Sequence, residues 1–114
     1  QGIRTSIFVD ADLAMVNGAA EAGADRIELY TESYAARYGQ DREHSILDFT
    51  VAAKRASELG LGLNAGHDLD RKNLKYFAQN IPNLLEVSIG HAFVADSLYF
   101  GLENTVGLYL RELR

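Results

Sequence analysis

An α/β fold built from four consecutive strand–helix units is predicted by the order of apolar and amphipathic segments. Short apolar segments recur along the chain, starting near residues 4, 25, 61 and 84. Stretches with helical spacing of apolar residues separate them, and glycine or proline marks several boundaries. Strands that alternate with helices in this way form parallel sheets covered by helices.

The first strand–helix–strand unit follows from residue type and capping. Residues 3–9 (IRTSIFV) are rich in β-branched and aromatic side chains, which favour a strand. Asp10 or Asp12 can cap the helix that follows, and Gly23 can end it. Residues 25–30 (DRIELY) are then predicted to form the second strand.

A polar segment at about residues 31–42 is predicted to be a long loop. It exceeds the two to six residues that usually connect a strand to the next helix, and such long loops are often lids. Tyr30, Tyr34 and Tyr38 could close over a substrate, or only pack the loop against the protein. The mobility of this segment is left open by the sequence.

The second half of the chain continues the alternation. A helix over 46–59, a strand over 61–65, a helix over 70–79 and a strand over 84–89 are predicted from their apolar spacing. One apolar stripe, from Leu98 to Leu113, predicts a single last helix. The strands contain apolar runs, so we expect them to be buried on both faces.

Residues 1–114 are interpreted as one domain, for which two architectures are possible. Four units could form a small doubly wound sheet or half of an eight-stranded TIM (β/α)8 barrel, which needs roughly 250 residues when complete. We expect the half-barrel, because its strands would all deliver their carboxyl ends to one rim. A half-barrel exposes two sheet edges, which favours pairing with a second copy or with a missing half.

Composition argues against several classes of partner. The net charge of −5 provides no basic surface for nucleic acid or for an anionic membrane. The sequence contains no run of eighteen or more apolar residues, the length of a membrane span. It also contains no cysteine, which is consistent with a cytoplasmic location and excludes thiolate chemistry.

Two Gly-His pairs follow predicted strands and are the strongest functional signal. His67 follows Gly66 after the third strand, where an imidazole could act as a general acid or base, or only cap a backbone group. His91 follows Gly90 at the start of the last helix, where free backbone N–H groups favour an anion such as phosphate. Both positions lie at the predicted catalytic rim of the sheet.

Glu28 is an acidic residue inside the apolar second strand. Burying an unpaired carboxylate costs several kcal/mol, so Glu28 needs a partner, a proton or an open cavity. It could pair structurally with Arg4 or Arg26, or it could line the pocket and stabilise charged intermediates. Glu28 and the two histidines could also hold a metal, but no local ligand motif supports this, and we expect no metal and no cofactor.

Four segments together resemble the pyridoxine 5′-phosphate synthase family of vitamin B6 biosynthesis. The resemblance covers essentially the whole chain, in the family's order, and rests on segments 6–10 (SIFVD), 24–29 (ADRIEL), 64–69 (NAGHDL) and 88–92 (SIGHA). The family is an eight-stranded βα barrel, and this chain resembles its strands five to eight. We therefore expect part of an enzyme that forms a homo-oligomer or pairs with the missing N-terminal half.

The resemblance implies a reaction and a set of site residues. It implies condensation of 3-amino-2-oxopropyl phosphate with 1-deoxy-D-xylulose 5-phosphate to pyridoxine 5′-phosphate, phosphate and water, without metal or cofactor. By position, His67 resembles the family's proton donor and Glu28 its transition-state stabiliser. Asp68, Gly90 and His91 resemble substrate-binding positions.

Two departures leave alternatives open. Residues 30–32 are Tyr-Thr-Glu where the family often has His-Thr-Gly. The family's other catalytic histidine and glutamate belong to its first four strands, so we expect this chain to be inactive alone. It could instead be a non-catalytic half-barrel that binds phosphate compounds or assembles with itself, or a different barrel enzyme, such as a sugar-phosphate isomerase.

Overall fold

The computed structural model describes residues 3–114 and contains one parallel sheet with strand order β1-β2-β3-β4. Each strand pairs with the next one along the chain, so the predicted four βα units and their parallel order are confirmed. The strands are β1 (Ser6–Val9), β2 (Arg26–Tyr30), β3 (Gly62–His67) and β4 (Leu84–Ile89). Because neighbours in the sheet are neighbours in sequence, the sheet follows the successive order of a barrel segment.

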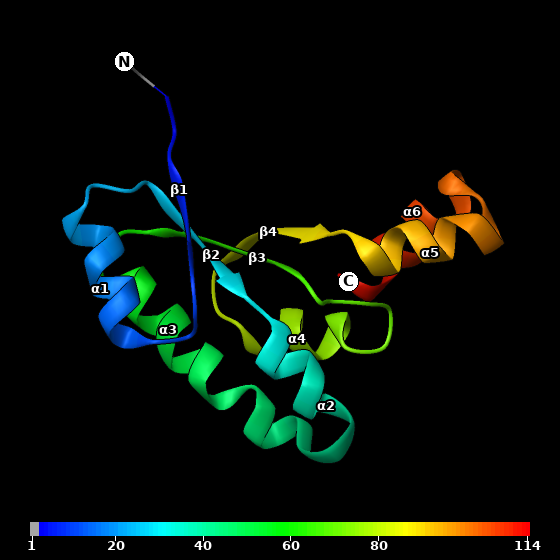
Figure 1. The fold of residues 1–114 in the computed structure, drawn as a ribbon, viewed down its shortest axis with the longest axis horizontal. Helices are drawn as coiled ribbons and strands as arrows, with labels where there is room; N and C mark the ends of the chain where they lie inside the picture. Colours follow the sequence, from blue (N-terminus) through cyan, green and yellow to red (C-terminus); the bar gives the residue numbers. More distant parts are fainter. Residues whose placement is uncertain (1–2) are drawn as a thin grey trace.

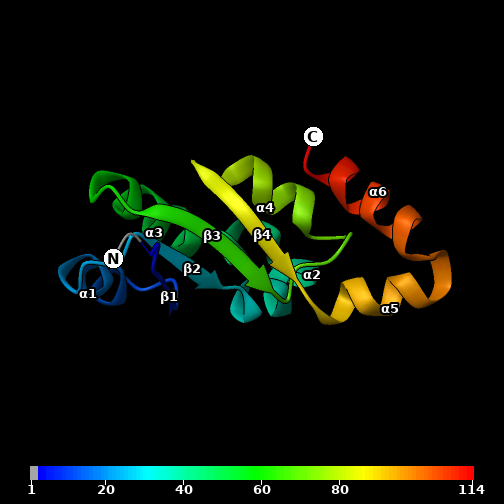
Figure 2. The ribbon, with the colours of Figure 1, turned by 90° about the horizontal axis from the view of Figure 1, so that it is seen from above.

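Helices connect the strands and follow the last of them. They are α1 (Leu13–Glu21), α2 (Glu32–Ser45), α3 (Leu47–Glu58), α4 (Leu74–Asn80), α5 (His91–Phe100) and α6 (Leu102–Glu112). Helices α1 to α4 lie against one face of the sheet, whereas α5 projects beyond the end of β4 and α6 turns back towards it (Figures 1 and 2). The sheet is therefore covered on one face.

The uncovered face corrects the expectation that the strands are apolar on both sides. Ile27 and Leu29 of β2 are fully buried under the helices, but the alternate residues Arg26 and Glu28 lie on the opposite face. There the Arg26 guanidinium contacts Glu86 of β4 at 3.1 Å. Side chains alternate between the two faces of a strand, so the sheet has one apolar face and one largely polar face.

Residues 32–42 are helical, so the prediction of a long loop at about residues 31–42 is wrong. They belong to α2, in which only Asp41 has non-helical backbone angles (φ −155°, ψ 84°). Most of this helix is polar, and that composition concealed it in the sequence. Tyr34 and Tyr38 are four residues apart, which places them on the same face of a helix, and their rings are 5.6 Å apart.

Tyr34 is part of the hydrophobic core and cannot close over a substrate. It is fully buried, with its ring 5.0 Å from Phe77 of α4 and 6.0 Å from Phe49 of α3. Its hydroxyl donates a hydrogen bond to the Asn73 carbonyl oxygen at 2.5 Å. Burial raises the pKa of the phenol above its ordinary value. The tyrosine thus fixes α2 on the two helices beside it.

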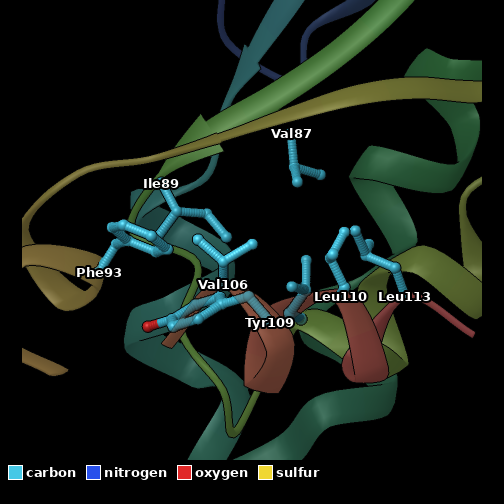
Figure 3. A pocket seen from close by; sticks show the side chains of 8 residues that line it. Val87, Ile89, Phe93, Val106, Tyr109, Leu110 and Leu113 are labelled. Atoms are coloured by element: carbon cyan, nitrogen blue, oxygen red, sulfur yellow. The ribbon is translucent and has the colours of Figure 1, made fainter. Parts of the chain in front are cut away.

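The predicted single last helix is also wrong, because Gly101 divides it into α5 and α6. Gly101 has a φ of 80° and a ψ of 153°, which are not helical and which glycine adopts without a side-chain clash. The predicted stripe is consequently split: Tyr109 on α6 is buried, whereas Leu98 on α5 is 83% exposed. An apolar pocket lies between α6 and β4, with Tyr109 and Phe93 at one end and Leu113 at the other (Figure 3).

Candidate functional site

Glu28, in the middle of β2, and His67, the last residue of β3, are in contact. The Nδ1 atom of His67 lies 3.6 Å from Oε2 of Glu28. The Glu28 side chain is 17% exposed and that of His67 is 57% exposed, so the carboxylate is behind the imidazole and the imidazole faces outwards. A carboxylate in this position can orient an imidazole and stabilise its protonated form.

The structure does not pair Glu28 with Arg4 or Arg26, which was the structural alternative for this residue. Arg26 and Arg4 approach Glu86 instead, at 3.1 and 3.9 Å. Arg26 also donates to the Asn64 side-chain oxygen at 3.2 Å. These polar side chains pair with one another, and among the described residues Glu28 forms its ion pair with His67.

Gly66 has no side chain, which leaves room for Ser88 of β4 on one side and for the Glu28 carboxylate of β2 on the other. A Cβ atom at this position would collide with the backbone oxygen of Ser88 and would lie 3.0 Å from the Ser88 Cβ and 3.2 Å from Oε2 of Glu28. The backbone atoms of β4 cannot move away without breaking the sheet. A glycine here is therefore a steric requirement of the site.

Replacing Gly66 with alanine is expected to destabilise the chain by about 1–3 kcal/mol, because the added methyl group overpacks the contact between β3 and β4. Chemical denaturation measures this loss. The control is Gly18→Ala in α1, where no atom lies within 4 Å of the added Cβ. That change should stabilise the chain by roughly 0.5–1 kcal/mol. Equal stabilities of the Gly66→Ala and parent chains would contradict the close approach.

Thr31 was not predicted as a site residue, although it fixes the turn that carries His67. Thr31 is fully buried, and its hydroxyl donates to the Gly66 carbonyl oxygen. The Thr31 hydroxyl oxygen in turn accepts a hydrogen bond from the Asp68 backbone N–H at 3.2 Å. The available signal was its place in the segment 30–32, next to the end of β2.

His67 itself has a backbone conformation that is unusual for a residue with a side chain. Its φ is 79°, in the left-handed region. Such a conformation costs free energy and persists when surrounding contacts impose it, which is common at functional sites. Here the Thr31 hydrogen bonds to both neighbours of His67 impose the turn.

Two aromatic rings flank the His67 imidazole on the uncovered face of the sheet. Phe8 of β1 meets it edge-on with ring centres 4.8 Å apart, and Tyr30 of β2 lies 6.0 Å away. The nearby Glu32 carboxylate raises the pKa of the Tyr30 phenol. Phe8 was not predicted as a site residue, because its contact with His67 depends on strands two apart in the sheet.

The second Gly-His pair lies beside His67 at the same edge. His67, Ser88, Ile89 and Gly90 line a pocket of about 170 Å³. Gly90 precedes α5 and offers open space at its α-carbon, so a ligand could approach the first N–H groups of this helix. The structure thus brings Glu28, His67 and Gly90 together.

Three predicted site residues do not line this pocket: Glu28, which contacts the lining residue His67, and Asp68 and His91. Asp68 and His91 each follow a lining residue along the chain, and each is exposed. The third histidine, His44, is exposed and paired with Asp41 at 2.5 Å. Asp68 and His91 are therefore placed at the edge by their backbone, with side chains free to turn towards a ligand.

Two further observations concern the part of the chain that the structure describes. Across residues 3–114, no three histidine, aspartate or glutamate side chains cluster in a way that could hold a metal ion. Over the same residues, every helix is too short or too polar to cross a bilayer.

A parallel sheet with a contact between an acid and an imidazole and an open helix N-terminus at its carboxyl edge is typical of α/β enzymes, which place their sites at that edge. The family model described as "Pyridoxal phosphate biosynthesis protein PdxJ" matches residues 1–114. The chain belongs to this family.

Named proteins that are similar in sequence to the chain are consistent with this family. The pyridoxine 5′-phosphate synthases of Cytophaga hutchinsonii and Flavobacterium johnsoniae are 61% and 56% identical to the chain over 113 residues, which is 99% of this chain and 48% of each relative. That of Parabacteroides distasonis is 60% identical over 96% of this chain and 46% of its own length. The chain spans about half the length of the curated relatives it matches, and the matched part is their C-terminal half.

The chain also aligns with a solved structure, an N-acetylneuraminic acid (sialic acid) synthetase from Leptospira borgpetersenii in complex with citrate. The identity is 14% and the TM-score is 0.47. The alignment covers 96% of this chain and 51% of that one. At this level of similarity it carries no argument about function.

Proposed function

We propose that this chain supplies half of the active site of a pyridoxine 5′-phosphate synthase. The reaction would condense 3-amino-2-oxopropyl phosphate with 1-deoxy-D-xylulose 5-phosphate, releasing phosphate and water. The family and the names of relatives 55–61% identical support this proposal. The observation that carries it is the contact between Glu28 and His67 beside a pocket that Gly90 also lines.

Each site residue has a proposed role that agrees with its position. His67 would donate a proton to the reacting substrate, because its imidazole is exposed at the rim. Glu28 would stabilise positive charge that develops on His67 or on the substrate. Gly90 and His91 would bind a phosphate group at the N-terminus of α5, and Asp68 would bind substrate polar groups.

We further propose that four more βα units complete the site. β1 and β4 are the edges of the sheet, and their outer backbone groups remain available for pairing with further strands. Large apolar side chains on the uncovered face, such as Phe8 and Leu85, are 46% and 56% exposed. An N-terminal half could cover both features.

The absence of cysteine from the sequence favours a cytoplasmic location for the protein.

The proposed function is tested with a fused protein, in which the N-terminal half of the Cytophaga hutchinsonii relative precedes residue 1 of this chain. The fused protein should form pyridoxine 5′-phosphate from the two substrates. The 114-residue chain alone should form essentially none, since general acid–base groups contribute about 10²–10⁴-fold each and one set is missing. A correctly folded but inactive fused protein would overturn the proposal.

The second candidate function is a non-catalytic half-barrel that assembles with itself. The same exposed residues on the uncovered face favour it, since a second copy could bury them. Sedimentation of the 114-residue chain distinguishes the two arrangements. A stable dimer would support self-assembly, whereas a monodisperse monomer would argue against it.

A further inference from the structure

Asp96, in the middle of α5, links three segments of the protein through one oxygen atom. Its Oδ2 atom lies 3.1 Å from Nε of Arg71, which belongs to the segment between β3 and α4. The same Oδ2 accepts a hydrogen bond from the Tyr109 hydroxyl of α6 at 2.8 Å. The Arg71 guanidinium also lies over the ring of Phe100, 5.0 Å from its centre.

This polar link matters because α5 has few other attachments to the protein. None of its residues is buried, and Val94, Leu98 and Tyr99 are 60%, 83% and 86% exposed. The helix projects from the end of β4, as Figure 1 shows, with the β3–α4 segment passing beside it. Among residues 3–114, its two side chain–side chain hydrogen bonds to other elements both end on Asp96.

The Arg71 end of the link is itself held firmly. Asp70 accepts hydrogen bonds from the backbone N–H groups of Lys72 and Asn73, at 2.8 and 3.0 Å. The Asn73 carbonyl oxygen in turn accepts the hydrogen bond from buried Tyr34. Arg71 therefore projects from a segment that is fixed to the hydrophobic core.

The two ends of the link also carry the two parts of the candidate site. Arg71 follows His67 by four residues in the same segment, and Asp96 follows Gly90 by six residues, on the helix whose N-terminus Gly90 precedes. The distance between the imidazole and the N-terminus of α5 consequently depends on the contact between Arg71 and Asp96.

We propose that Arg71 and Asp96 are positioning residues that hold the N-terminus of α5 at a fixed distance from the His67 imidazole. This inference rests on the proposed function, because it assigns the link a role in presenting the substrate phosphate to the proton donor. The Tyr109 hydroxyl, and then the guanidinium, lower the pKa of the Asp96 carboxyl, so Asp96 is ionised at neutral pH. The link is therefore a charged hydrogen bond under working conditions.

The first test measures the link without using catalysis. Asp96→Asn and Arg71→Gln in the 114-residue chain should speed hydrogen exchange of the α5 amides about 5- to 30-fold, while the amides of β2 and β3 keep their rates. The matched control is Glu58→Gln, which breaks the 3.0 Å ion pair with Arg55 on α3. It should leave exchange in α5 unchanged. Unchanged α5 exchange in both link variants would overturn the inference.

The second test separates positioning from a purely structural role. In the fused protein, Asp96→Asn and Arg71→Gln should raise the KM for the phosphorylated substrates about 10-fold or more, with a smaller change in kcat and little change in the unfolding midpoint. Arg71→Lys, which keeps the charge, should recover part of the loss. An active fused protein whose variants keep their KM would overturn the positioning role and leave the proposed function standing.

An inactive parent fused protein would instead count against the proposed function. In that case the exchange measurement still decides whether Arg71 and Asp96 hold α5, because it needs no turnover. The two failures are thus distinguishable: one appears in the parent protein, and the other appears only in the link variants.

Discussion

Replacing His67 with glutamine is expected to lower formation of pyridoxine 5′-phosphate by the fused protein about 10²–10⁴-fold. Glutamine keeps a polar side chain of similar reach but cannot donate and accept protons near neutral pH. Because His67 is exposed and its turn is held by Thr31, the variant should fold normally. Initial rates at saturating substrate measure the effect on kcat.

The control for this experiment is His44→Gln, which removes a histidine that is 72% exposed and paired only with Asp41 on its own helix. Its activity should match that of the parent protein. If His67→Gln kept full turnover, His67 would be excluded as the proton donor. The carboxyl edge of the sheet would then bind the substrate without donating a proton from His67.

The second large effect concerns stability: Phe77→Ala is expected to destabilise the chain by about 3–5 kcal/mol. Phe77 is fully buried on α4, with ring centres 5.0 Å from Tyr34 and 5.7 Å from Phe49. Removing the ring leaves a cavity among α2, α3 and α4, and it also removes two edge-to-face contacts. Equilibrium unfolding in urea measures the loss.

Tyr99→Ala provides the matched comparison for this core substitution. Tyr99 is 86% exposed on α5, so its removal should change stability by no more than about 0.5 kcal/mol. A similar small change for Phe77→Ala would mean that the three rings do not form the core that holds α2 on the sheet.

The alternation of strands and helices was predictable from sequence because it depends on local residue patterns. Asp12, for example, caps α1 by accepting the Ala14 N–H at 2.7 Å, as its position before the apolar run predicts. Helix α2 was missed because its polarity outweighs a single buried tyrosine. The break at Gly101 was missed because the apolar stripe continues in register on both sides of it.

The site was predictable in part for a related reason. Glu28 and His67 stand out within their own segments, one as a carboxylate inside a strand and the other after a glycine. Thr31 and Phe8 do not, because their roles arise only when β1, β2 and β3 are placed side by side. The contacts between strands depend on their pairing register, which joins residues far apart in the sequence, so the pattern within one segment does not reveal them.

The central claim is that one edge of the sheet binds a phosphorylated substrate with its reacting atoms beside Glu28 and His67. A crystal structure of the fused protein with 1-deoxy-D-xylulose 5-phosphate tests it most directly. The account predicts the phosphate within hydrogen-bond distance of the backbone N–H groups at the start of α5, and the sugar carbons facing the His67 imidazole. A phosphate bound elsewhere, with the sugar away from His67, would contradict it.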